Sequence, residues 1–75
     1  MILVPRAVLE GIEAVRRSGR TNMLDRPAVV RLADQLGHHA TVLWIHEHPA
    51  EYARGVFHGF LVEPDPFDER GAPDA

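Results

Sequence analysis

The chain has 75 residues, of which 45% are hydrophobic and 25% are charged, a balance that is ordinary for one globular domain. It contains no cysteine, which excludes a disulfide framework and any cysteine-based metal or nucleophile site, and no apolar run approaches the roughly 18 residues of a membrane span. The net charge of −3 is uneven, because residues 1–62 hold seven arginines against six acids whereas residues 63–75 hold five acids against one arginine.

The first predicted element is a helix over residues 4–17. Val8 and Ile12 recur at helical spacing in this segment. Pro5 suits the first turn of a helix, where its missing N–H costs no hydrogen bond. Gly19 fits the left-handed position at which many helices end.

A connecting stretch, "RRSGRTNMLDRP" at residues 16–27, leads into a second predicted helix that ends at Gly37. Asp25 is a good N-cap, and Pro27 fits the first turn that follows it. The next residues, "AVVRLADQL", repeat their apolar positions at helical spacing. This is the clearest amphipathic helix of the sequence.

Residues 42–45, "VLWI", are four large apolar residues in a row, and the run alone fits either a strand or a helix. A helix is favoured because no other segment alternates like a partner strand. We expect this helix to be buried on most sides, since it is apolar around most of its circumference. It should end near Glu47, because Pro49 disfavours helix at the residue before it.

Pro49 then opens a fourth predicted helix, and residues 60–62 are expected to finish as an extended piece. The sequence therefore predicts an all-α fold, a small bundle of three to four short helices over residues 1–62. Residues 63–75 are acidic and rich in proline, and we expect them to be a disordered tail.

The five histidines do not form a recognisable metal motif. The zinc pattern H-E-x-x-H fails because Ala50, and not histidine, lies four residues after His46. Neither Ser18 nor Thr21 has a histidine near it in sequence, and no glycine-rich phosphate loop is present. We expect no metal, no cofactor and no enzymatic activity.

The stretch "LADQLGHHATVLWI" has the outline of a DNA-binding helix-turn-helix. Two positions depart from that pattern, because His38 and His46 stand where it requires apolar core residues. The helix that would enter the groove is also apolar, whereas base recognition needs polar side chains. Binding of DNA also relies on neutralising phosphates, and the near-neutral body offers little positive charge for that.

The arginine-rich stretch between the first two predicted helices is a candidate anion-binding site, suited to a phosphate, a nucleotide or an acidic protein surface. Its members are Arg16, Arg17, Arg20, Thr21, Asn22 and Arg26. A solvated basic turn with ordinary capping residues explains the same pattern. Both interpretations stay open.

The third and fourth predicted helices carry many large apolar residues. For each of them, the three other short helices of the bundle cannot easily cover all of that surface. A contiguous apolar surface of this kind marks an interface, and pairing with an identical chain about a two-fold axis is its commonest use. The candidate partner-binding residues are Trp44, Tyr52, Phe57 and Phe60. The alternative is that the fold closes on itself around Trp44.

Two motifs and their surroundings resemble a family of short bacteriophage and prophage proteins of unassigned function. One is Ser-Gly-x-Thr-Asn-Met-x-Asp, from Ser18 to Asp25, and the other is I-x-x-x-P-x-x-Y, from Ile45 to Tyr52. The likeness extends over about residues 3–62. It implies an accessory protein made in the cytoplasm of a bacterial host, and it assigns no catalytic residue.

The sequence predicts a non-enzymatic protein that acts by binding, as a homodimer, to a host or phage protein. Inhibition of a host or defence protein is the role that the phage resemblance suggests. The alternative function is binding of nucleic acid or a nucleotide through the arginine-rich stretch, as in a helix-turn-helix-like regulator. No membrane partner is expected.

Overall fold

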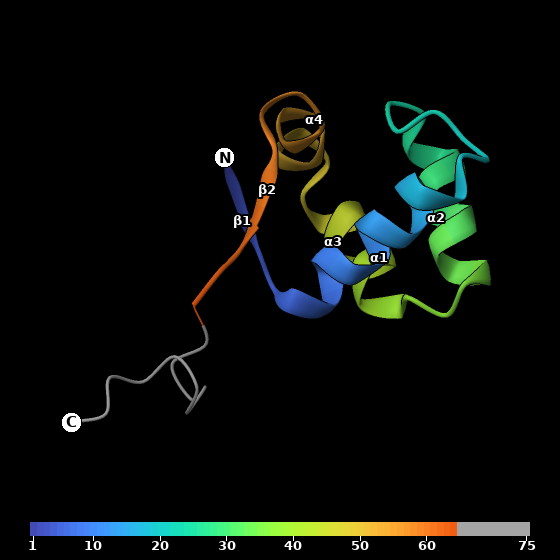
Figure 1. Cartoon of the computed structure of the whole chain (residues 1–75), viewed down its shortest axis with the longest axis horizontal. Helices are drawn as coiled ribbons and strands as arrows, with labels where there is room; N and C mark the ends of the chain where they lie inside the picture. The colour runs from blue at the N-terminus through green and yellow to red at the C-terminus, as the bar shows by residue number, and fades with distance from the viewer. Residues whose placement is uncertain (65–75) are drawn as a thin grey trace.

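The computed structural model describes residues 1–64, which fold into four helices and two short strands (Figure 1). In chain order these are β1 (Ile2–Val4), α1 (Arg6–Ser18), α2 (Arg26–Gln35), α3 (His39–Glu47), α4 (Pro49–His58) and β2 (Phe60–Val62). The small, mostly helical fold expected from the sequence is confirmed. The predicted disordered tail lies outside the described residues from residue 65 onward.

Capping residues that are close in sequence determine where the helices begin and end. Gly19 ends α1 in the left-handed conformation with φ 65°, as predicted. The Asp25 side chain caps α2 by accepting a hydrogen bond from the N–H of Ala28 at 3.3 Å. The ambiguous apolar run is helical and lies in α3, and Pro49 is the first residue of α4.

The start of the chain differs from the prediction. Residues 2–4 form β1 instead of leading into a helix, and Pro5 is the N-cap of α1 with extended backbone angles, φ −58° and ψ 151°. β1 pairs in parallel with β2, so that Ile2 lies opposite Phe60 and Val4 opposite Val62. The physical reason is that the residue before a proline favours extended backbone, and that residues 60–62, distant in sequence, lie beside residues 2–4 and supply a partner strand.

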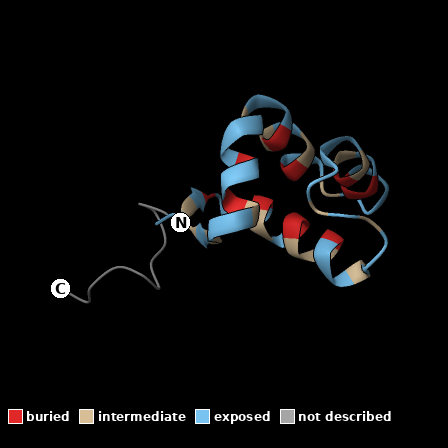
Figure 2. Cartoon of the chain, turned by 90° about the horizontal axis from the view of Figure 1, so that it is seen from above, coloured by how far each residue is buried: buried red, intermediate tan, exposed pale blue. Residues whose placement is uncertain are grey.

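The core lies where α1, α2 and α3 meet. The buried residues of this core are spread over the four helices and β1 (Figure 2). The buried apolar set is Val4, Val8, Ile12, Val15, Val29, Leu32, Ala33, Ile45 and Tyr52. Thr41 is the buried polar residue of the described chain, and its hydroxyl donates to the carbonyl of Val8 at 2.9 Å. That bond ties α3 directly to the backbone of α1.

The expectation that α3 is buried on most sides was wrong. Thr41 and Ile45 are its buried residues, whereas Val42 and Trp44 are half-buried and Leu43 is 59% exposed. Because α3 packs against α1 and α2 along one side, four consecutive residues cannot all face the core. The apolar surplus of the sequence is therefore partly on the surface.

Candidate functional site

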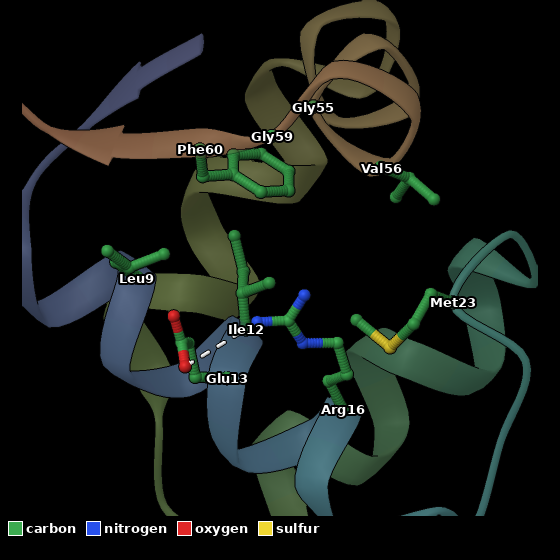
Figure 3. Close-up of a pocket in the computed structure, with 9 residues that line it drawn as sticks. All are labelled: Leu9, Ile12, Glu13, Arg16, Met23, Gly55, Val56, Gly59 and Phe60. Carbon is green, nitrogen blue, oxygen red and sulfur yellow. Dashed lines mark ion pairs between the residues drawn. The ribbon is translucent and has the colours of Figure 1, made fainter. Parts of the chain in front are cut away.

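A pocket of about 210 Å³ opens between α1 and the α4–β2 segment, and we call it the α1–α4 pocket (Figure 3). It is lined by Leu9, Ile12, Glu13, Arg16, Met23, Gly55, Val56, Gly59 and Phe60. These residues come from three separate parts of the chain. The pocket is thus a product of the fold and not of any local motif.

Apolar side chains from three segments line about half of the pocket. Leu9 and Ile12 come from neighbouring turns of α1, and Met23 faces the space from the connection between α1 and α2 (Figure 3). Val56 and Phe60 close the other side. A cavity of roughly 150 Å³ with such walls can hold a benzene ring, so this pocket has room for one apolar side chain.

Two glycines let the wall on the α4 side form. A side-chain carbon on Gly55 would lie 2.7 Å from Cδ1 of Phe60, so the absence of that carbon lets the ring rest against the α4 backbone. Gly59 has φ 97°, a conformation that favours glycine, and it turns the chain from α4 into β2. The two glycines therefore set the position of Phe60 over the pocket.

One pair of charges lies at the mouth of the pocket. Arg16 Nη2 is 3.6 Å from Glu13 Oε2, and their side chains are 66% and 40% exposed. A long, exposed ion pair of this kind adds little to stability. Its guanidinium and carboxylate therefore remain able to bind polar groups that enter beside an apolar side chain.

Tyr52 belongs to the core and not to the outer surface. It is 2% exposed, and its hydroxyl donates to the carbonyl of Met23 at 2.6 Å. Its ring centroid lies 6.0 Å from that of Phe60. Desolvation by burial raises the pKa of the Tyr52 phenol to about 12. Tyr52 thus packs near Phe60, which lines the pocket, and the Tyr52 side chain itself is not available to a partner.

The other three candidate partner-binding residues lie in different environments. Phe60 lines the α1–α4 pocket, and Phe57 is 71% exposed on the far side of α4. Trp44 is half-buried, with its ring 4.9 Å from His48 and 6.4 Å from Phe60. The predicted aromatic set is therefore split between the core, the pocket and the outer surface.

The candidate anion-binding residues do not share one pocket. Arg16 lies at the mouth of the α1–α4 pocket, and Asn22 uses its side-chain oxygen to accept the N–H of Leu24 at 2.9 Å. Thr21 is half-buried, while Arg17 and Arg20 are exposed. Arg16 thus lines a pocket to which the other members of the set do not contribute.

Arg26, the last member of that set, lines a different, shallow groove of about 440 Å³ between α2, α3 and the start of α4. We call it the basic groove. It also contains Arg31 and His46, which the sequence analysis did not assign to an anion site. Sequence spacing gave no signal for this groove, because Arg26 and Arg31 are five residues apart and do not share one helix face, and His46 comes from another helix.

Within residues 1–64, no three histidine or acidic side chains come together in a group that could hold a metal ion. None of the helices in the same residues combines the length and apolar character of a membrane span.

Residues 6–59, which include α1 to α4 and the glycine that precedes β2, match a domain of unknown function, DUF5049. No curated protein and no solved structure matches the chain. Because the match spans more than half of the sequence, the chain belongs to the DUF5049 family.

Proposed function

We propose that this protein is a non-enzymatic binding module that takes an apolar side chain of a partner protein into the α1–α4 pocket. The observation that carries the proposal is the pocket itself, which combines apolar side chains from three segments of the chain with the charged pair Arg16 and Glu13. Peptide segments are recognised in this way, with an apolar anchor in a pocket and polar groups fixing its orientation.

The charges at the mouth define the kind of segment that fits. Arg16 offers a forked donor to a carboxylate or a carbonyl, and Glu13 offers an acceptor to a donor group. A segment with an aromatic or leucine anchor would fill the pocket, and a carboxylate beside that anchor would accept hydrogen bonds from Arg16. The resemblance to short phage and prophage proteins supports a bacterial host or phage protein as the owner of that segment, and inhibition of a defence protein in the cytoplasm as the outcome.

The test fills the pocket from Val56, a half-buried residue that lines it and packs against the edge of the core. Val56→Trp places an indole in the α1–α4 pocket, and Leu43→Trp is a matched control because Leu43 is exposed on α3 and does not line the pocket. Selection from a random peptide library displayed on beads should enrich peptides with one apolar anchor. We expect these peptides to bind the wild type and the control, and to lose at least about tenfold in affinity for Val56→Trp, or about 1.4 kcal/mol.

Equal binding of the selected peptides to Val56→Trp and to the wild type would contradict the proposal. The two variants are compared by circular dichroism first, since both must keep the helical content of the wild type. A selection that enriches only acidic peptides without an anchor would direct attention to the basic groove instead.

A second candidate function is binding of an anionic group in the basic groove, and it follows from a specific observation. Arg26 and Arg31 line the groove from α2, and His46 faces them from α3. Two guanidinium groups and an imidazole on one surface suit a phosphate. This relocates the nucleotide or nucleic-acid hypothesis from the stretch at residues 16–22 to the surface between α2 and α3.

This second function has its own test. Replacing Arg26 and Arg31 together by glutamine should abolish binding of a fluorescent single-stranded oligonucleotide, whereas replacing Arg17 and Arg20 should have a smaller effect. Fluorescence anisotropy at two salt concentrations measures the change, because phosphate contacts weaken as salt rises. If the wild type shows no binding at low salt, or the two double variants behave alike, the basic groove is not an anion site.

A further inference from the structure

Phe67 is the one aromatic residue of the chain that lies outside the described residues 1–64. It is also the one large apolar residue of the acidic segment that follows β2, and three acids lie within two positions of it, Asp65, Asp68 and Glu69. An aromatic anchor with carboxylates beside it is the kind of segment that suits the α1–α4 pocket. The chain therefore contains a match for its own pocket.

The pocket fits this anchor in size and offers a partner to its carboxylates. Its volume of about 210 Å³ exceeds the roughly 150 Å³ that holds a benzene ring, so the ring of Phe67 has room to enter. The Arg16 guanidinium is exposed at the mouth and can donate to a carboxylate next to the anchor. Glu13 lies at the same mouth, and Arg70, three residues after Phe67, is the group of the segment that can pair with it.

Charge also brings the segment toward this end of α1. Arg16 and Arg17 occupy the last turn of the helix, Arg20 follows it, and all three are exposed. Residues 63–75 hold five acids against one arginine. Opposite charges on the two surfaces raise the rate at which they meet.

The segment does not reach the pocket of its own copy. Phe60 lines the pocket, and β2 then leads the chain away from α4 (Figure 1). Its pairing with β1 continues to Glu63, whose N–H donates to the Val4 carbonyl at 2.9 Å. Four residues of extended chain place Pro64 about 13 Å beyond Phe60. A four-residue turn from Pro64 would end at Phe67 within about 7 Å of Pro64, still well short of Phe60.

We propose that the α1–α4 pocket of one copy takes Phe67 of a second copy, and that the two copies exchange these segments about a two-fold axis. The inference rests on the proposed function and names the partner of that site, a second copy of this chain. Reciprocal exchange makes the contact twice and closes the assembly, whereas a one-way contact would build open chains. A carboxylate of the entering segment accepts hydrogen bonds from Arg16 of the copy that holds the ring.

Two prolines before the anchor favour this exchange. Pro64 and Pro66 have a fixed φ, and each favours extended backbone at the residue before it. A segment restricted in this way loses less entropy when it binds. Extended backbone between Pro64 and Phe67 also favours a contact with another copy over a return to the same one.

Two variants of the full chain separate the two halves of the contact. Phe67→Ala removes the anchor and keeps the pocket open, whereas Val56→Trp fills the pocket and keeps the anchor. We expect sedimentation equilibrium to show a monomer–dimer equilibrium for the wild type, and each variant alone to dimerise at least about tenfold more weakly. Phe57→Ala is the matched control, because Phe57 is exposed on α4 and does not line the pocket, and it should dimerise like the wild type.

An equimolar mixture of Phe67→Ala and Val56→Trp gives the sharper result. One intact pocket then meets one intact anchor, so the two variants should form a 1:1 complex more tightly than either associates with itself. This recovery excludes misfolding as the cause of the single effects, because both altered chains are present in the complex. A wild type that stays monomeric at all concentrations overturns the inference, and so does a mixture that fails to associate.

A labelled peptide of residues 64–70, PDPFDER, distinguishes this inference from the proposed function on which it rests. It should bind saturably to Phe67→Ala, whose pocket is open, and at least about tenfold more weakly to the double variant Phe67→Ala/Val56→Trp. If peptides selected from the library bind to the pocket and this peptide does not, the exchange is wrong and the proposed function stands. If neither kind of peptide binds, both are wrong.

Discussion

Replacing Gly11 by alanine is expected to lower the free energy of unfolding by about 3 kcal/mol. Helix propensity alone predicts the opposite, a gain of about 1 kcal/mol, because alanine is the better residue inside a helix. The packing of α1 on α3 determines whether this substitution raises or lowers the free energy of unfolding. A side-chain carbon on Gly11 would lie 2.7 Å from Cβ of Thr41 and 2.8 Å from Cβ of His38. Both atoms are attached directly to the backbone, so the helices themselves must separate.

The separation would also weaken the hydrogen bond by which Thr41 is satisfied. Its hydroxyl donates to the carbonyl of Val8 at 2.9 Å, one turn of α1 before Gly11. A buried hydroxyl that loses its partner costs about 1–3 kcal/mol. The overlap and the lost hydrogen bond therefore act together and outweigh the gain in helix propensity.

Thermal unfolding followed by circular dichroism measures this effect. For a domain of this size, 3 kcal/mol corresponds to a fall in Tm of about 12–24 °C. Gly19→Ala is the matched control, because nothing lies within 4 Å of the added carbon and its cost is confined to the left-handed backbone, φ 65°. That cost is about 1 kcal/mol. A Gly11→Ala variant as stable as the wild type would mean that α1 and α3 are farther apart than the structure shows.

The helices could be predicted from sequence because their signals are local. Gly19, Asp25 and Pro49 each act on the backbone within a few residues, and all three mark helix ends in the structure. β1 could not be predicted, because three residues show too little alternation to indicate a strand. Its partner Phe60–Val62 lies more than fifty residues away along the chain, and sequence spacing does not reveal such a pairing.

The burial of single residues depends on which face of a helix meets the rest of the fold. Leu43 and Tyr52 illustrate the problem, since both looked like candidates for an interface or a core, yet one is 59% and the other 2% exposed. Composition counts apolar residues without saying which of them point inward. The α1–α4 pocket was missed for the same reason, because it depends on how far α4 stands from α1.

The position of α4 in turn depends on Tyr52. This helix packs against β1 and α3, and the bond from the Tyr52 hydroxyl to the Met23 carbonyl joins it to the connection between α1 and α2. Replacing Tyr52 by alanine is expected to lower the free energy of unfolding by about 3–5 kcal/mol, since a buried aromatic side chain and its hydrogen bond are both removed. A domain of this size has a total stability of about 4–11 kcal/mol, so much of it would be lost.

The loss should not be uniform along the chain. We expect the amides of α4 and Gly59 to exchange with solvent faster in Tyr52→Ala, while those of α1 near Val15 stay protected. Hydrogen exchange followed by NMR at low temperature resolves the two groups. Equal acceleration in both would show that α4 unfolds together with the rest of the domain. Tyr52→Phe keeps the ring and should cost only about 1–2 kcal/mol, which separates the hydrogen bond from the packing.

The pH dependence of stability checks the same contact in the unmodified protein. Tyr52 is the one tyrosine of the chain, so the absorbance of ionised phenol reports on it alone. Its pKa is raised from 10.0 to about 12 by burial, which means that the fold favours the neutral phenol. Stability from this source is complete below pH 10 and is lost as the pH rises toward 12. Tyr52→Phe should lack this loss, because phenylalanine has no proton to release. A phenol that titrates near pH 10 in the folded protein would place Tyr52 in solvent, and α4 would then have lost its link to Met23.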